Sequence, residues 1–542
     1  MGITVEPQGL VYLCKTNLEP DYKHQLTFAN ATAQQNYFSL NTVLAHSYSG
    51  YTYIRKDNAI KIEAPIDTIR DCNYLYYQNK GFTTKYYYCF ITGMKYLSEN
   101  STLVEIQTDC FQTYMFDLSY KYSFIEREHV ASAQDTCDGN TVPEGLETGE
   151  YVIASNTEVG IGTSGALVGF MVTNPPYNGA PITYITHSIG NVYSGFLSFA
   201  TTYQDATKII DMYNDSSVTT ADAIKNIYML PYECANTTTS ETWNDGTRSA
   251  TIYMIQTNTQ QVKTASITES TSFEGYTPKN KKLYTYPYKY FHISNNVGTD
   301  VVFKWEDCEK DLTNNINKVN LIVEAIANCG AQSIIYPKIY KNHDTSGTGA
   351  SQLMNYGVSG AKYPCCAWVT DYYTNWLTQN GVNMSLSVVS STVSGLGYGA
   401  SVGGAWGAVG GAAMGALSAT TSALGQMYQA ATTPDQGHGD TGVGDITFSN
   451  QQCAFNVYDM GIRGEYAKII DEFFTMYGYK INRVKQISFN SRSNWNYIKT
   501  VDANIEGNIP PDDLITIKNM FNNGVTMWHN PSTMLDYSQN NI

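Results

Sequence analysis

The first part of the chain consists of short runs in which apolar and polar residues alternate. Such alternation places one kind of side chain on each face of a strand, so it predicts β-structure. Polar breaks at residues 55–58 and 97–100 are typical of turns. The predicted strand segments are residues 9–18, 52–66 and 85–109, and a short helix over 110–118 is expected to close the block.

A turn-rich stretch at residues 127–151 follows and predicts a domain junction. Beyond it the pattern is mixed, because some runs have the period of a strand and others the period of a helix. Strands are predicted at 150–160 and 165–173, and helices at 205–214 and 220–230.

Three local signals in this middle region give specific expectations. Thr219 or Thr220 is a candidate N-cap for the second predicted helix. Pro287 lies in a tyrosine-rich run and suits an edge strand or a bulge better than a central strand, because proline cannot donate to the ladder. For residues 319–330 the period alone does not decide between strand and helix.

The C-terminal part carries the clearest helical pattern. Residues 464–480 have apolar side chains at i, i+3, i+4 and i+7 spacing, and Gly478 is placed to end the helix. A further helix is expected at 511–523, with Pro511 or Asp512 at its start and Gly524 after its end. The predicted apolar face of the first helix comprises Tyr466, Ile469, Ile470, Phe473, Phe474 and Tyr477.

An uncharged tract interrupts this otherwise polar chain. From residue 372 to residue 434 there is no Asp, Glu, Lys, Arg or His. Within the tract glycine returns at every fourth residue, and in an α-helix such residues form one slowly winding face. The glycines are Gly395, Gly399, Gly403, Gly407, Gly411 and Gly415, and the larger side chains among them include Trp406, Met414 and Leu417.

This glycine ladder would let a second helix approach closely, as small-residue seams do in lipid. In water, six interior glycines cost on the order of 6 kcal/mol of helix stability relative to alanine, so the tract needs a partner or a membrane to become helical. The span 386–428 is long enough for one long helix or two passes of a bilayer. A flexible linker and a buried helical hairpin are the other open interpretations.

Composition narrows the class of protein. A chain of 542 residues is too long for one core, so two to four domains are expected. Only 15% of the residues are charged, the net charge is −15, and 44 tyrosines favour strands, as in virion proteins and extracellular adhesins. The acidic balance argues against tight nucleic-acid binding, which depends on cationic contacts to phosphates, but it would let DNA slide past.

The cysteines indicate a reducing compartment. The chain has 11 of them, scattered and without a C-x-x-C pair, which matches neither a disulfide framework nor a zinc site. Buried free thiols are therefore expected. The sequence shows no cationic and apolar leader, and Glu6 argues against myristoylation of Gly2, so we expect synthesis and folding in a cytoplasm.

No motif for catalysis or metal binding is present. The eight histidines lack metal-ligand spacing, and His438, with Asp435 and Asp440 nearby, is interpreted as part of a polar loop. We predict no catalytic residue, no cofactor and no metal, and do not expect an enzyme. Three acidic pairs are interpreted as solvated surface charge: Glu126 with Glu128, Glu144 with Glu147, and Asp512 with Asp513.

Two blocks are more specific than composition. The first is TDCFQTYMFDLSYKYSFIEREHV at 108–130, followed by PEGLETGEY. The second is FFTMYGYKINRVK at 473–485, followed by NWNYIKT and IKNMFNNGVTMWH. Together with the Tyr-Pro-Tyr stretch and the uncharged tract ahead of the second block, they resemble the distal tail-tube, or tail knob, proteins of small short-tailed podophages of Gram-positive bacteria. The resemblance covers most of the chain and is weakest between about 150 and 280.

The resemblance implies a fold that is mainly β with some α. Tail-tube-like β-barrel or sandwich domains would form a homohexameric ring, with long hydrophobic Gly/Ala-rich loops that plug the lumen. On infection the loops would insert into the host membrane as a channel for genome ejection. The implied partners are the upper tail or lower collar protein of the virion, lipid of the host cytoplasmic membrane, and double-stranded DNA that passes through the lumen without specific binding.

Carried over to this sequence, the resemblance assigns roles to particular residue ranges. The membrane-active loop itself would run from about 386 to 433, with the glycine ladder as its packing surface, and the block at 477–483 would be structural. A tail-associated cell-wall hydrolase and a receptor-binding adhesin remain as alternatives. The chain would have four parts: an N-terminal tube domain at 1–135, middle knob domains at 136–370, the membrane-active loop and its exit at 371–450, and a C-terminal return to the tube at 451–542.

Overall fold

A computed structural model of the chain describes most of the residues outside the uncharged tract. The predicted loop and exit at 371–450 lie outside the described residues, and so do His438 and the candidate membrane-active residues Gly395, Gly399, Gly403, Trp406, Gly407, Gly411, Met414, Gly415 and Leu417. The described ranges are 9–51, 58–79, 84–160, 166–189, 192–219, 223–311, 316–328, 332–341, 343–344, 357–363, 365–367, 454–539 and 541–542.

The chain divides into two compact units. Unit 1 comprises Met1–Gly149, Gly275–Thr285 and Gly464–Ile542, and unit 2 comprises Glu150–Glu274 and Tyr286–Arg463. The backbone therefore passes from one unit to the other four times, after residues 149, 274, 285 and 463. The short segment Gly275–Thr285 is an excursion into unit 1 in the middle of unit 2.

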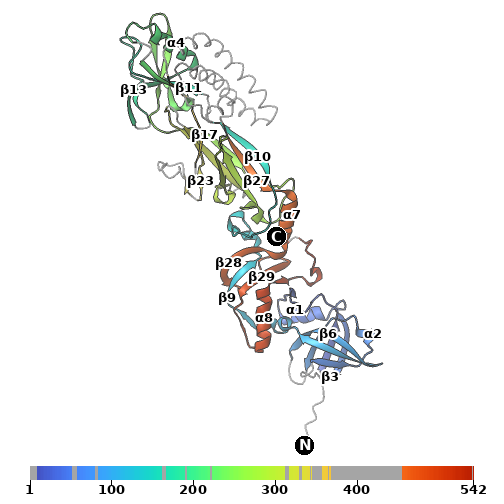
Figure 1. Cartoon of the computed structure of the whole chain (residues 1–542). Helices are drawn as coiled ribbons and strands as arrows, with labels where there is room; N and C mark the ends of the chain where they lie inside the picture. Colours follow the sequence, from blue (N-terminus) through green and yellow to red (C-terminus); the bar gives the residue numbers. More distant parts are fainter. Residues whose placement is uncertain are drawn as a thin grey trace. The chain divides into compact units, whose positions relative to one another are not determined.

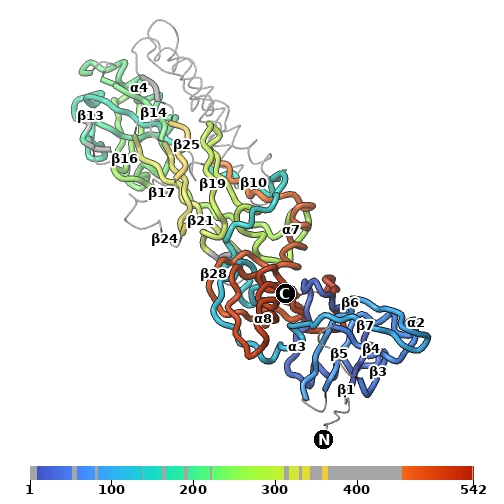
Figure 2. The backbone as a smooth tube through the Cα atoms, turned by 60° about the horizontal axis from the view of Figure 1, so that its bottom comes forward, coloured from blue at the N-terminus to red at the C-terminus, as the bar shows by residue number. Residues whose placement is uncertain are grey.

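Unit 1 contains a six-stranded antiparallel sheet from the N-terminal part of the chain (Figure 2). In spatial order its strands are β3 (Leu44–Tyr51), β1 (Gly9–Cys14), β5 (Tyr74–Asn79), β6 (Tyr86–Ser98), β7 (Ser101–Thr108) and β4 (Ala59–Ile62). Three short helices accompany it: α1 (Ala31–Phe38), α2 (Ile66–Ile69) and α3 (Cys110–Tyr114), the last continued by a 3-10 turn at Met115–Asp117.

A second sheet of unit 1 joins segments from both ends of the chain. Its order is β2 (His24–Leu26), β31 (Val525–Trp528), β29 (Trp495–Asp502), β9 (Tyr122–Glu128) and β28 (Tyr479–Gln486). The helix α8 (Pro511–Asn523) lies against β29 (Figure 1). The other elements are α7 (Gly464–Tyr477), the strand pair β8 (Leu118–Tyr120) and β30 (Ile505–Gly507), and 3-10 turns at Ser132–Gln134, Cys137–Gly139, Lys281–Tyr284 and Pro531–Thr533.

One hydrophobic core ties these two sheets together. It draws on Phe38 and Tyr74 from the N-terminal part and on Trp495, Phe521 and Trp528 from the C-terminal part, all fully buried. Strands β2 and β31 pair in parallel, with His24 opposite Thr526. Because burial of large aromatic side chains is a major source of stability, the two ends of the chain stabilise each other.

Unit 2 consists of antiparallel sheets around a separate core. The four-stranded sheet has the order β10 (Tyr151–Gly160), β27 (Ala454–Ile462), β18 (Lys289–Ser294) and β19 (Asp300–Phe303). The seven-stranded sheet has the order β15 (Ala235–Asn244), β16 (Ser249–Ile255), β13 (Val192–Thr201), β11 (Ala166–Val172), β14 (Ile224–Pro231) and β26 (Cys365–Ala367), with β12 (Thr186–Ile189) paired to β13.

In the seven-stranded sheet, the helix α4 (Tyr203–Asn214) packs beside β16. A five-stranded sheet completes unit 2. Its order is β17 (Gln260–Thr268), β21 (Ile316–Ala325), β22 (Gln332–Pro337) and β25 (Val358–Lys362), with β20 (Lys310–Asp311) paired to β21. The remaining elements are the short pair β23 (Ile339–Tyr340) and β24 (His343–Asp344) and 3-10 turns at Tyr232–Cys234 and Trp305–Asp307.

The fold class is confirmed: the described chain is mainly β with some α. The predicted helices at 110–118, 205–214, 464–480 and 511–523 correspond to α3, α4, α7 and α8. In α7, however, Ile469 is exposed, and the buried stripe is formed by Ala467, Ile470 and Phe474 with the charged Asp471 among them. The prediction therefore placed the buried face too far round the helix, because the exposed side of α7 also carries apolar residues.

Two local predictions were wrong. Residues 220–230 do not form a capped helix, since Ile224–Pro231 is the strand β14, and the helix that threonine caps is α4, at Thr202. β14 lies between β11 and β26 and buries consecutive apolar residues on both faces, a pattern that mimics helical spacing. Pro287 lies neither on an edge strand nor in a bulge but ahead of β18, an inner strand.

Two open points are resolved by the structure. Within residues 319–330, the described residues up to Ala325 belong to the strand β21. Seven cysteines whose side chains the structure describes are buried and free, as predicted: Cys14, Cys72, Cys89, Cys110, Cys137, Cys234 and Cys308.

The end of α7 generates a stability prediction. Gly478 has φ of +63°, and a Cβ there would lie 2.3 Å from the carbonyl oxygen of Glu128. A non-glycine residue in this conformation costs about 1–2 kcal/mol, and the clash with fixed backbone adds to that. We expect Gly478→Ala to lower the free energy of unfolding of unit 1 by about 3 kcal/mol or more, measured by urea denaturation.

Gly145→Ala is the matched control. Gly145 has φ of +71° but nothing within 4 Å of the added Cβ, so this variant should lose only the conformational term of about 1–2 kcal/mol. Equal losses in the two variants would contradict the role of Gly478 in allowing the close approach to β9.

Candidate functional site

The acidic residues proposed from sequence occupy different environments, and two of them correct the prediction of solvated charge. Glu128 and Glu144 are buried, because cations from distant segments neutralise them: Lys485 pairs with Glu128, and Lys282 with Glu144. Glu126 pairs with Lys499 at 2.9 Å on the adjacent strand. These groups hold segments together.

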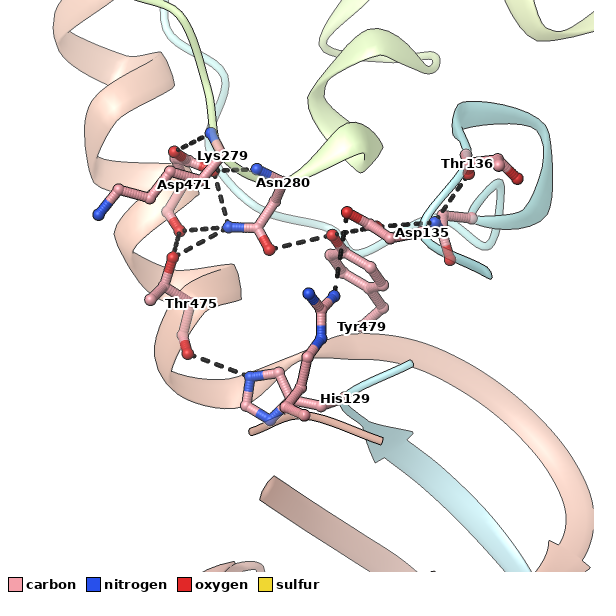
Figure 3. Close-up of polar contacts among 10 residues, drawn as sticks. His129, Asp135, Thr136, Lys279, Asn280, Asp471, Thr475 and Tyr479 are labelled. Carbon is pink, nitrogen blue, oxygen red and sulfur yellow. Dashed lines mark hydrogen bonds and ion pairs between the residues drawn. The ribbon is translucent and has the colours of Figure 1, made fainter. Parts of the chain in front are cut away.

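The Asp471 carboxylate on α7 is buried in unit 1, where it is 1% exposed. It accepts hydrogen bonds from the backbone N–H groups of Lys279 (2.8 Å) and Asn280 (2.9 Å). It also accepts from the Tyr276 hydroxyl at 2.7 Å. All three donors belong to Gly275–Thr285, so one buried carboxylate anchors this excursion to α7. Figure 3 shows the bonds from Lys279 and Asn280. We call this set of contacts the polar anchor.

Asn280 extends the anchor from α7 to the adjoining strand. Its amide nitrogen donates to Asp471 Oδ1 at 2.8 Å and to the Thr475 hydroxyl at 3.0 Å. Its amide oxygen lies 3.0 Å from the hydroxyl of Tyr479, the first residue of β28, and the same hydroxyl donates to Asp135 at 2.7 Å (Figure 3). The Tyr479 hydroxyl thus joins three segments that are far apart in sequence, since it contacts both Asn280 and Asp135.

Asp135 is buried, and burial raises its pKa. The buried guanidinium of Arg492 lies 3.9 Å from its carboxylate, and Asn140 donates to it at 3.4 Å. The hydrogen bond from Tyr479 and the charge of Arg492 act in the opposite direction to burial. The turn at 132–139 is therefore fixed to the C-terminal part of unit 1 by a carboxylate in an apolar setting.

His129 is buried in its neutral form. Its Nε2 donates to the Thr475 carbonyl at 3.1 Å, while Nδ1 accepts from the Tyr497 N–H at 2.7 Å. A second proton on Nδ1 would point at that N–H. Burial, followed by the charge of Arg492, lowers the pKa of His129 to about 3. This histidine connects the end of β9 to α7 and β29.

A buried ion cluster lies in the same unit. The Glu144 carboxylate pairs with both Arg127 and Lys282 and also accepts the backbone N–H of Lys480 at 2.8 Å. Arg127 donates to the Gly478 carbonyl at 2.6 Å, at the junction of α7 and β28. Removing one member would leave a buried charge unpaired, which costs about 3–5 kcal/mol in comparable cases.

Unit 2 has a cluster of its own around Lys289 on β18. The ammonium donates to the carbonyl and hydroxyl oxygens of Ser270, both at 2.6 Å, and lies 3.6 Å from the carboxylate of Asp459 on β27. Asp459 also accepts from the Trp305 indole N–H at 3.1 Å. Nearby, burial raises the pKa of Glu269, whose carboxylate accepts from Asn317.

In the part of the chain that the structure describes, no three His, Cys, Asp or Glu side chains are grouped as metal ligands. The buried carboxylates bind backbone N–H groups and cations, which positions segments rather than substrates. None of the described helices combines the length and apolar character needed to cross a bilayer.

Sequence reasoning missed the polar anchor, although one signal was available. Asp471 falls between Ile470 and Phe474 on the buried stripe of α7, and a charge at such a position requires partners. Its partners are about 190 residues away in the chain, and no local pattern reveals which segment supplies them.

Family models match two parts of the chain. The C-terminal domain of the tail knob protein gp9 of Bacillus phage phi29 matches residues 241–542. The N-terminus of the caudoviral major tail protein matches residues 9–119, which include the six-stranded sheet of unit 1.

Whole-chain relatives agree with these matches. The chain is 26% identical to the tail knob protein gp9 of Bacillus phage phi29 over 94% of each chain. It is 27% identical to tail knob protein gp9 of Bacillus phage B103 over 96% of each. The structure of the bacteriophage C1 tail knob protein gp12 has a similar fold, with a TM-score of 0.64 at 11% identity over 98% of both chains.

His129 generates a prediction about acid stability. The folded state keeps this imidazole neutral down to a pKa of about 3, whereas in the unfolded chain it takes up a proton below about pH 6.5. Unfolding therefore consumes a proton in this window, and the group's contribution to stability falls as the pH falls from about 6.5 towards 3. The slope is at most about 1.4 kcal/mol per pH unit.

The measurement compares the wild-type chain with His129→Gln, whose amide can donate to the same carbonyl without titrating. Urea denaturation of both proteins from pH 7.5 to pH 4 should show a shallower decline for the variant, after each curve is referred to its own value at pH 7.5. Parallel curves would mean that the buried imidazole contributes nothing to acid sensitivity.

Proposed function

The chain belongs to the bacteriophage tail knob protein family, and on this premise we propose that six copies form the distal tail tube and plug its lumen with their uncharged tracts. On infection the tracts leave the lumen, insert into the host cytoplasmic membrane and form a channel for the genome. As a tail knob protein it is a structural component of the virion.

The observation that carries the proposal is where the uncharged tract is inserted. It lies between Ala367, the end of β26, and Ala454, the start of β27, and both strands belong to unit 2. The tract is therefore an insertion whose two ends are held by a folded unit, not a tail or a linker between domains. A tethered insertion can change its surroundings while the units that carry it stay folded.

The chemistry of the tract suits a bilayer. A charged residue at the centre of a membrane helix costs about 2.5–3.5 kcal/mol on insertion scales, and residues 372–434 contain none. Glycine at four-residue spacing lets helices from several copies pack closely in lipid. Because most of its side chains are small, insertion favours several copies acting together, which a ring of six supplies.

The charge of the chain suits a conduit for DNA. With a net charge of −15, most surfaces would repel phosphates, and the affinity of DNA-binding proteins comes largely from cationic contacts. The genome would pass through the lumen without specific binding. In the virion the ring would join an upper tail or lower collar protein. No enzymatic step, cofactor or metal is needed for this role.

Membrane activity is tested by dye release from liposomes. The intact protein should release dye, and deletion of residues 386–433 should abolish release while the oligomer persists. Two double variants separate the effect of charge from that of side-chain size. Gly403→Asp with Gly407→Asp should reduce dye release at least tenfold, because two charges must enter the bilayer. Alanine at both positions should retain dye release. Equal release by the deletion variant would refute the membrane role.

The ring is tested by electron microscopy in projection. Purified protein or isolated tails should show six-fold rings with a central lumen, and native mass spectrometry should give six copies of a 60.2 kDa chain. Trimers that bind cell walls saturably would instead favour the adhesin alternative. Clearing of Gram-positive walls by the protein alone would favour the hydrolase.

A further inference from the structure

At one end of the four-stranded sheet in unit 2 the outward side chains are mostly apolar, whereas the other end carries a polar row of Glu158, Asn456, Ser294 and Asp300. Residues alternate along β27, so Phe455, Val457 and Asp459 are buried while Asn456, Tyr458 and Met460 point the other way. The same alternation on β18 buries Phe291 and Ile293 and turns Tyr290 and His292 outward. A sheet face exposed to water normally carries polar side chains.

The outward residues form continuous rows across the strands. In one row Ile153 of β10 pairs with Met460, which pairs with Tyr290. In the next, Asn156 of β10 pairs with Tyr458, Tyr458 pairs with His292, and His292 pairs with Val302 of β19. Ile153 is 57% exposed and Val302 52% exposed. We call six of these residues the outer sheet face: Ile153, Met460, Tyr290, Tyr458, His292 and Val302.

Aromatic rings extend this face at one end. Tyr290 lies against Tyr151 and Tyr286, with ring centroids 5.2 and 6.1 Å apart, and the Lys304 ammonium lies 5.0 Å from the centre of the Tyr286 ring. Within the face, the rings of His292 and Tyr458 are 4.8 Å apart. A cluster of partly exposed apolar and aromatic side chains of this kind is typical of a contact site.

We propose that the outer sheet face is the docking surface for the chain's own uncharged tract, residues 386–433, before membrane insertion. This inference rests on the proposed function, since it assigns a resting place to the plug loop. The first argument is connectivity. The stretch that contains the tract ends at residue 453, and Ala454 begins β27, the strand that contributes Tyr458 and Met460.

Reach and concentration favour the chain's own tract over other occupants. The 20 residues from 434 to 453 can span up to about 70 Å when extended, whereas a four-stranded sheet is only about 14 Å wide. A segment tethered within this distance has an effective concentration on the order of millimolar. A second molecule in solution would need high affinity to compete with it.

The chemistries of the two surfaces match. The tract has no charge that would have to be desolvated on an apolar face. Its glycines and alanines allow the backbone to approach flat aromatic rings closely, so contact area is gained without deep pockets. Burial on the sheet would stabilise by roughly 25 cal/mol for each Å² of apolar surface removed from water, a term that the bilayer can replace when the tract is released.

Photo-crosslinking tests the assignment in the full-length, assembled protein. p-Benzoylphenylalanine is placed at Tyr458 or at Val302 on the face, and at Ile182, which is 54% exposed elsewhere in unit 2, as the matched control. After irradiation, mass spectrometry should map crosslinks from the two face positions to peptides within 386–433, at least fivefold above the control. Crosslinks to other segments, or none above the control, would overturn the proposal.

Mixed assemblies of ¹⁴N- and ¹⁵N-labelled chains determine whose tract is bound. Crosslinks should join peptides of the same isotope, and a majority of mixed-isotope pairs would overturn the assignment to the chain's own tract. A second measurement uses chymotrypsin, which cuts after Tyr398 and Trp406. Val302→Glu should speed cleavage at these sites at least tenfold, whereas Ile182→Glu should not, and unchanged rates would also count against docking.

Dye release is read separately from these experiments. If crosslinks form but liposomes stay intact, the docking surface is established and the membrane role fails. If liposomes leak but the face does not contact the tract, the docking proposal fails and the membrane role stands.

Discussion

The Asp471 carboxylate, buried in α7 and bound to the backbone of Lys279 and Asn280, is the constraint on which unit 1 depends. A buried charge is tolerated only when its hydrogen-bonding capacity is filled, so α7 and Gly275–Thr285 must be in register before either is stable. Since the backbone enters and leaves unit 2 on both sides of this segment, the anchor also fixes where two of the four crossings begin.

The polar clusters in the two units differ in partner but follow the same rule. Asp135 and Glu144 in unit 1, and Asp459 in unit 2, are each buried beside a cation and at least one further donor. A chain with only 15% charged residues can therefore keep several of them buried in its interior. Buried charges contribute little net stability against well-packed apolar groups, but a wrong register leaves them unpaired, so they favour one arrangement of segments that are distant in sequence.

Sequence alone predicted the elements whose information is local. The helices α7 and α8 follow from apolar spacing and from the glycines behind them, and the scattered cysteines correctly indicated buried thiols. The strand β14 was predicted as a helix because both of its faces are buried, so it lacks the alternation of polar and apolar residues that identifies a strand. Ile469 was predicted to be buried because the exposed side of α7 also carries apolar residues. The polar anchor could not be located because its pairings join residues about 190 positions apart. Glu144 was misjudged because Lys282, one of its cations, lies 138 positions away in the chain.

The uncharged tract stands outside this scheme for a physical reason. A segment without ionisable groups cannot form an anchor like that of Asp471, and its glycines disfavour helix in water by about 1 kcal/mol each. In the proposed function, apolar surface, other copies of the tract or lipid would order it, and none of these sets a unique register as strictly as a buried charge does. Under the proposed function, a tract without charged side chains can exchange one apolar environment for another, while the charged anchors keep the units that carry it folded.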